Sequence, residues 1–187
     1  MNDAAIMPAV RYTRTAVALH WLIALLILAA IPLGMTMTEL ILSPTKLKLY
    51  SWHKWLGVGI FFLVVLRLAW RLWYRPPALP ETMPGWQRAA AGLSHGLLYL
   101  LMLAIPLSGW LMSSAKGFQT VWFGIWPIPD LIGRDPAWGD FFEETHEALV
   151  GLLLGLLVLH VAAAIKHHVI GRDDVLTRML PWLKRKE

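Results

Sequence analysis

The sequence predicts an all-α integral membrane protein, a four-helix bundle with its N and C termini in the cytoplasm. Three observations predict it. Of the 187 residues, 57% are hydrophobic and 16% are charged, whereas soluble domains are about 45–50% apolar and about 25% charged. Four segments are long and apolar enough to cross roughly 30 Å of hydrocarbon, which takes about 20 residues. Lysine and arginine concentrate on one side of these segments.

The first two predicted spans cover residues 15–38 and 49–73. The first contains no charged residue. In the second, Lys54, Arg67 and Arg71 lie toward the ends, where long basic side chains can reach the membrane interface. No small-residue cleavage site closely follows the first segment, so we expect it to remain as a span rather than to be removed as a signal peptide.

The other two predicted spans cover residues 89–113 and 146–168. The third span contains no charge, and neither does the centre of the fourth. Pro32 and Pro106 fall in or near the ends of spans, where neighbouring helices can satisfy the backbone groups that proline leaves free. Two proline-rich segments, the second ending at Pro136, predict loops. Four spans with short loops use nearly the whole chain, so residues 1–187 are predicted to form one transmembrane domain.

Basic residues predict the orientation, because cytoplasmic loops of membrane proteins carry an excess of lysine and arginine. Twelve fall on the side of the two termini, namely Arg11, Arg14, Arg67, Arg71, Arg75, Arg88, Lys166, Arg172, Arg178, Lys184, Arg185 and Lys186. Five fall on the other side, namely Lys46, Lys48, Lys54, Lys116 and Arg134, together with six acidic residues between 130 and 147. The termini are therefore predicted to be cytoplasmic. This distribution indicates that the net charge of +5 reflects contact with anionic lipid and not binding of nucleic acid.

Histidine is the residue type that points to a function. The sequence has no cysteine, which excludes disulfides, cysteine-ligated iron–sulfur clusters and covalent c-type haem attachment. A polar side chain within a span is costly and marks a functional site by default. Six of the seven histidines lie in or at the ends of spans, namely His20, His53, His95, His146, His160 and His167. His168 is expected to be solvated.

The histidines occur at matched depths. His146 and His160 are fourteen residues apart, so they share one helix face at two depths about 21 Å apart. His53 matches His146 on the outer side, and His20 best matches His160 on the cytoplasmic side, where His95 competes with it. A haem iron can take one imidazole on each side, and a four-helix bundle can supply both. The pattern predicts two b-type haems, although any single histidine could instead be a satisfied polar group or an interfacial anchor.

Two histidines are left for a second task. His167 follows His160 by seven residues, which places it about 10 Å nearer the cytoplasm and too far away to bind the same iron. His95 and His167 are therefore predicted to hold the carbonyl oxygens of a quinone and to deliver protons to it. Anchoring at the interface is an equal alternative for His167. A haem-free transporter is less favoured, because transport sites usually recruit Asp or Glu within the spans.

Several motifs resemble those of the bacterial cytochrome b561 family, which is related to the haem-b subunits of hydrogenases. They are Ala-Leu-His20-Trp-Leu, Trp52-His53-Lys54 with Gly57, Ser94-His95-Gly96, Pro106-Leu-Ser-Gly109-Trp110 and His146-x13-His160. The resemblance covers almost the whole chain and implies a multi-pass protein of the bacterial inner membrane. It also implies two b haems, one between His20 and His160 and one between His53 and His146, with ubiquinone at the end that holds His95 and His167.

One branch of that family is similar to a superoxide oxidase, which implies a superoxide:ubiquinone oxidoreductase. Lys46, Lys48 and Lys54 lie beside His53, and positive charge there would draw the superoxide anion toward the outer haem. These lysines could equally be a solvated helix entry. The acidic residues between 130 and 147 would oppose the attraction if they lie near the same haem.

Two further interpretations remain open. The chain could be a haem-b anchor subunit that passes electrons between a dehydrogenase partner and quinone, because residues 113–145 are long enough to dock a partner. Gly151-x-x-x-Gly155 fits close helix packing. That packing could be a contact in a homodimer or a contact within the bundle.

Overall fold

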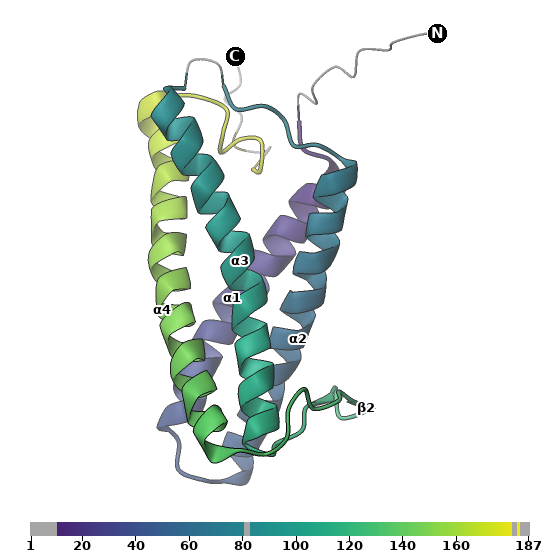
Figure 1. Ribbon diagram of the computed structural model, residues 1–187. Helices are drawn as coiled ribbons and strands as arrows, with labels where there is room; N and C mark the ends of the chain where they lie inside the picture. Colours follow the sequence, from purple (N-terminus) through teal and green to yellow (C-terminus); the bar gives the residue numbers. More distant parts are fainter. Residues whose placement is uncertain (1–10, 81–82, 181–182, 184–187) are drawn as a thin grey trace, which may run out of the picture.

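The computed structural model describes residues 11–80, 83–180 and 183, and four long helices dominate it (Figure 1). They are α1 (Arg14–Glu39), α2 (Pro44–Trp73), α3 (Gly85–Ala115) and α4 (Pro136–Lys166), and α4 continues into a π-helical turn, η1 (His167–Gly171). Each of the four is long and apolar enough to cross a membrane. The predicted all-α four-helix class is confirmed, and the chain is a multi-pass membrane protein.

The fourth helix begins well before the predicted span, which starts at residue 146. Asp135 caps it, since its Oδ1 accepts hydrogen bonds from the backbone N–H groups of Ala137 (2.9 Å) and Trp138 (3.2 Å). Pro136, predicted to lie in a loop, occupies the first helical position, where its missing N–H costs nothing. The first turns of α4 therefore extend beyond the apolar span and carry its acidic residues.

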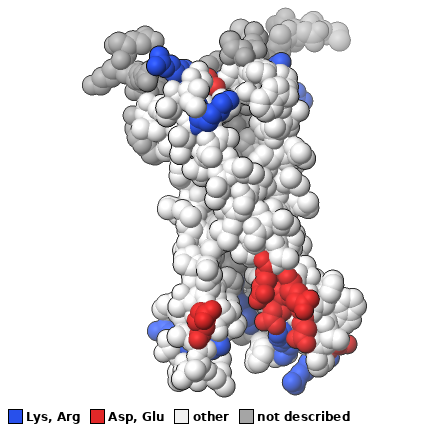
Figure 2. Space-filling model, turned by 90° about the vertical axis from the view of Figure 1, so that its left-hand side faces the viewer, with Lys and Arg blue, Asp and Glu red and all other residues white. Residues whose placement is uncertain are grey.

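Consecutive helices run in opposite directions, so the start of α1 and the end of α4 lie at the same end of the bundle (Figure 1). The opposite end carries the connection between α1 and α2 and a two-stranded antiparallel sheet of β1 (Val121–Trp122) and β2 (Trp126–Pro127). We call this the outer end, and the other the inner end, after the orientation that the sequence predicts. Basic side chains occur at both ends (Figure 2).

The centre of the bundle is an apolar layer. Ile27 of α1, Ile60 of α2 and Leu153 of α4 are buried there, with Val64 fully enclosed beside them. Met102 of α3 packs against this cluster. Away from this layer the helices expose large apolar side chains such as those on α4, as a lipid-facing surface requires. The apolar layer separates the polar side chains of the two ends.

The small outer sheet is fastened to the start of α2. Lys54 Nζ donates a hydrogen bond to the Phe118 carbonyl (2.7 Å), and Trp55 Nε1 donates to the Val121 carbonyl (2.7 Å). Trp122 Nε1 returns a hydrogen bond to the Trp55 carbonyl (3.2 Å). These bonds hold the connection between α3 and α4 against the outer end of α2.

Gly151 and Gly155 are exposed, and a Cβ built on either would meet nothing within 4 Å. The structure thus places this motif on an open face of α4 and rules out the alternative of close packing within the bundle.

Candidate functional site

Two histidines face each other at the outer end. The ring centres of His53 on α2 and His146 on α4 are 6.2 Å apart. His53 Nδ1 lies 3.1 Å from the carbonyl oxygen of Ala30, and His146 Nδ1 lies 2.9 Å from that of Ile105. A carbonyl can only accept, so each Nδ1 carries the proton and donates it. Nε2 of both rings is then free of a proton and can bind a metal.

Glycine makes room for both outer rings. A Cβ on Gly34 of α1 would lie 3.0 Å from Cε1 of His53, and a Cβ on Gly109 of α3 would lie 3.1 Å from Cε1 of His146. Ser108 Oγ also lies close to the His146 ring, 3.2 Å from Nδ1, and it donates a hydrogen bond to the same Ile105 carbonyl (2.8 Å). The imidazoles are therefore fixed by the neighbouring helix backbones as well as by their own helices.

Three histidines gather at the inner end. The ring centres of His20 on α1 and His160 on α4 are 6.3 Å apart, close to the separation of the outer pair. His95 on α3 lies nearer to His160, with ring centres 5.5 Å apart. The structure thus brings both sequence candidates, His20 and His95, to His160.

The separation of the helices distinguishes those two candidates. In the part of the chain that the structure describes, α3 and α4 pack directly on each other, whereas no Cα of α4 comes within 8 Å of one in α1 or α2. His20 and His160 therefore reach toward each other across a gap between helices, and so do His53 and His146. His95 and His160 do not, because their helices are in contact. This difference favours His20 as the partner of His160.

A spacing of fourteen residues relates the two ends in every helix. The pairs are His20 and Gly34, His53 and Arg67, His95 and Gly109, and His146 and His160. Fourteen residues return the side chain to nearly the same helix face about 21 Å further along. Ile27, Ile60, Met102 and Leu153 lie midway in the same four series and form the apolar layer. The bundle is thus built of an outer site, an apolar layer and an inner site.

The family match is extensive. The model of the prokaryotic cytochrome b561 family matches residues 11–182 of this chain. The chain belongs to this family. Among curated proteins it is 36% identical to cytochrome b561 homolog 2 of Escherichia coli K12 (91% of each chain) and 30% identical to cytochrome b561 homolog 1 of the same strain (93% of this chain, 99% of the relative). It is 28% identical to a probable superoxide oxidase, CybB, of Yersinia pestis (91% and 96%).

Membership of the cytochrome b561 family implies membrane electron transfer and haem b, and the histidine pairs fit that group. A metal lies about 2 Å from a coordinating imidazole nitrogen, so two rings on opposite sides of one iron have centres about 6 Å apart. The separations of 6.2 Å and 6.3 Å agree with this. The gap between α4 and the other two helices, α1 and α2, lies between the rings of each pair, where a planar group such as a haem would require space.

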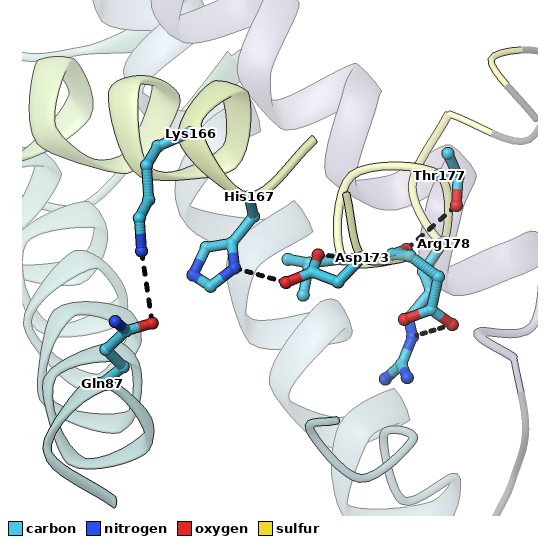
Figure 3. Close-up of polar contacts among 8 residues, drawn as sticks. Gln87, Lys166, His167, Asp173, Thr177 and Arg178 are labelled. Atoms are coloured by element: carbon cyan, nitrogen blue, oxygen red, sulfur yellow. Dashed lines mark hydrogen bonds and ion pairs between the residues drawn. The ribbon is translucent and has the colours of Figure 1, made fainter. Parts of the chain in front are cut away.

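His167 has a partner that the sequence did not suggest. It lies in η1, and its Nδ1 is 2.5 Å from Oδ2 of Asp173 (Figure 3). Asp173 also accepts a hydrogen bond from Val175 N on its other oxygen (3.1 Å). Asp174, the next residue, turns instead to Arg178, with Oδ2 2.9 Å from Nε. The pair of His167 and Asp173 is an imidazole and a carboxylate that can share one proton.

The three outer lysines form no ion pair within the described ranges. Lys46 Nζ donates to the Leu40 carbonyl (2.6 Å), Lys48 lies over the Trp52 ring (4.9 Å from its centre), and Lys54 is bonded to the Phe118 carbonyl. None of the three is therefore directly paired there, although the charge of Asp130 acts on Lys54 and offsets part of its charge.

Acidic side chains gather at the outer end of the face shown in Figure 2. Lys116 offsets part of this charge by pairing with Glu143 and, at 3.6 Å, with Asp140. Burial alone would lower the pKa of Lys116, but the hydrogen bond with Glu143 and the charges of Glu143 and Asp140 outweigh it and raise the pKa. Lys116 therefore stays protonated well above neutral pH, and the negative charge near His146 is smaller than the acidic residues alone suggest.

Sequence reasoning missed four elements of the two sites. Gly34 and Gly109 give no chemical signal, although their spacing of fourteen residues from His20 and His95 could have revealed them. The same spacing from His53 points to Arg67. No comparable signal marks Asp173, since its contact depends on how η1 ends.

Proposed function

We propose that this protein binds two b-type haems and carries electrons between the outer face of the bacterial inner membrane and ubiquinone. The outer haem lies between His53 and His146 and the inner haem between His20 and His160, with both termini cytoplasmic. The observation that carries the proposal is the pair of facing imidazoles at each end, with almost equal ring separations. Bound haem supplies one-electron redox chemistry at the two sites.

The reaction that we propose is the oxidation of superoxide by ubiquinone. Two superoxide anions each lose one electron and become O₂, and one ubiquinone gains two electrons and two protons. Similarity to the probable superoxide oxidase of Yersinia pestis supports this choice of donor. The protein residues position the sites, attract the anion and deliver the protons.

Lys46, Lys48 and Lys54 attract superoxide to the outer site in this proposal. None of them forms an ion pair with a described residue, and Lys54 directly follows the proposed ligand His53. Electrostatic attraction of a small anion raises its encounter rate and weakens as salt is added. Replacing Lys48, the exposed one of the three, by Gln should lower the rate at low salt and have less effect at high salt. If the variant reacts with superoxide at the wild-type rate at both low and high salt, Lys48 does not attract superoxide.

His95 and His167 serve the quinone in this proposal. His95 lies against His160 at the inner site, and His167 continues the same face of the chain one heptad further. Asp173 holds the His167 ring by its Nδ1. Its Nε2 can then face the quinone and take part in proton transfer.

Two measurements on detergent-purified protein test the proposal. Pyridine-haemochrome spectra should give two b haems per chain, and stopped-flow mixing with superoxide should reduce haem rapidly and then ubiquinone. One haem per chain would contradict the pairing at one site. A protein free of haem after expression with ample haem would favour the transporter interpretation. Haems that stay oxidised in superoxide would exclude superoxide as the donor.

A dehydrogenase donor is the second candidate, and the outer connection is the observation that favours it. Phe123, Ile125 and Trp126 are each more than half exposed beside the outer site, and exposed apolar side chains of this kind are typical of protein or membrane contacts. Affinity purification from mildly solubilised membranes distinguishes the candidates. A stoichiometric redox partner supports the anchor role, whereas isolated protein that reacts fully with superoxide supports the first proposal.

A further inference from the structure

Arg67 occupies the α2 position of the inner site, and no carboxylate in the part of the chain that the structure describes forms an ion pair with it. It follows His53 by fourteen residues and so lies on nearly the same face of α2. No Asp or Glu oxygen among the residues of known placement lies within 4 Å of its guanidinium. A charged side chain inside a membrane bundle is normally paired or marks a ligand path.

Neutral groups hold the guanidinium between two of the inner histidines. Arg67 Nη1 donates to the carbonyl of Ala16 (2.5 Å), and Nε donates to the hydroxyl of Tyr99 (3.0 Å). Ala16 lies one helical turn before His20, and Tyr99 lies one turn after His95, about 6 Å along each helix axis. The charge is therefore fixed beside the rings of both α1 and α3.

A second guanidinium lies close by. Arg71 is one turn further along α2, with Cζ 5.9 Å from the centre of the Tyr99 ring. Arg67, Arg71 and Tyr99 line one small recess of about 20 Å³ at the inner end. Two carboxylates that follow α4 are engaged elsewhere, Asp173 with His167 and Asp174 with Arg178. Among the described residues no carboxylate forms an ion pair with Arg67 or Arg71, so the inner site presents two cations.

We propose that Arg67 pairs with a propionate carboxylate of the haem between His20 and His160, and that Arg71 adds a second positive charge to that pair. The inference rests on the proposed binding of an inner haem. A b haem carries two carboxylates, and a buried carboxylate needs a hydrogen-bonded counter-ion. Guanidinium is the side chain best suited to a carboxylate, because its planar donors bind both oxygens.

This pairing has a measurable consequence for the inner haem. Removing the guanidinium leaves a negative carboxylate near the iron, which favours the oxidised form and lowers the midpoint potential. The outer haem lies about 21 Å away along the helices, so its potential should not change. The carboxylate itself should also report the loss in its vibrational spectrum.

The test uses holoprotein from cells supplied with a haem precursor that places ¹³C in the propionate carboxyl carbons. Redox titrations give the two midpoint potentials, and the potential lost in His20→Ala identifies the inner haem. Redox-difference infrared spectra give the ¹³C-shifted carboxylate bands. The variants are Arg67→Gln, Arg67→Lys and the control Arg75→Gln, whose residue is exposed beyond the end of α2.

Arg67→Gln should lower the inner potential and shift a labelled carboxylate band, Arg67→Lys should do both to a smaller degree, and Arg75→Gln should do neither. If Arg67→Gln does not retain haem, the band shift in Arg67→Lys decides, because lysine cannot reproduce a two-oxygen contact. An unmoved labelled band in a protein with two haems would overturn the pairing alone. If the wild type instead binds a single haem and His20→Ala retains it, no haem binds at the inner site, and the proposed inner haem itself is contradicted. An inner potential that follows the anionic lipid content of nanodiscs would assign Arg67 to a lipid phosphate and overturn the proposal.

Discussion

The His146 imidazole lies against the backbone of Gly109, where a Cβ would approach its Cε1 to 3.1 Å and its Nδ1 to 3.2 Å. Such a separation is shorter than ordinary van der Waals contact, so any larger residue must displace the ring. The Ile105 carbonyl, one turn earlier on α3, fixes the same ring through Nδ1. One turn of α3 therefore sets both the position and the tautomer of the proposed outer ligand.

Gly109→Ala should disturb the outer haem while leaving the inner one intact. The added methyl group pushes the His146 ring off its present axis, and α3 cannot easily retreat because it packs on α4. We expect a changed absorption band and midpoint potential for one haem, or loss of about one haem per chain. Gly92→Ala on the same helix is the control, since a Cβ there meets nothing within 4 Å. Equal spectra for both variants would show that the ring has room to move.

The choice between His20 and His95 can be tested by haem content. His20→Ala should reduce the protein from two haems to one, because no other described imidazole faces His160 across the gap between α4 and α1. His95→Ala should keep both haems and slow the reduction of quinone. Pyridine-haemochrome quantification of the two variants decides the assignment. The reverse result would make His95 the ligand and leave His20 for the quinone.

The ion pairs of Lys116 at the outer end should contribute less to the free energy of unfolding at alkaline pH. Its pKa in the folded protein is raised above the ordinary 10.5, so its pairing stabilises the fold fully below that value and is lost as pH rises through the folded pKa. Glu143 and Asp140 are 45% and 75% exposed, so the contribution should be only about 0.2–1 kcal/mol. The difference in unfolding free energy between wild type and Lys116→Met should be constant from pH 7 to about pH 10 and shrink above it. A difference that grows above about pH 10 would contradict the raised pKa.

The sequence predicts the fold well because the signals for spans are one-dimensional. Length, hydropathy and the absence of charge place all four helices, and the fourteen residues between His146 and His160 predict ligands at two depths. Which helices lie side by side is harder to predict, because the depth of a residue in the membrane does not indicate which helices are in contact. The choice between His20 and His95 as the partner of His160 therefore required the gap between α1 and α4, which only the structure shows. Likewise, the fit of Gly109 to His146 is a relation between two helices and cannot be read from either alone.

Asp173→Asn should slow the reduction of quinone without slowing the reduction of haem by the outer donor. The carboxylate holds His167 at 2.5 Å through Nδ1, and losing a partner that orients a functional histidine typically costs about 10–100-fold. Asparagine keeps an oxygen for the hydrogen bond from Val175 N, so the local turn should survive. Asp174→Asn is the matched control, because Asp174 pairs with Arg178 and not with His167. Stopped-flow traces that follow haem and quinone separately give both rates. If the two variants slow quinone reduction equally or not at all, His167 serves as an interfacial anchor and the proton for the quinone comes by another route.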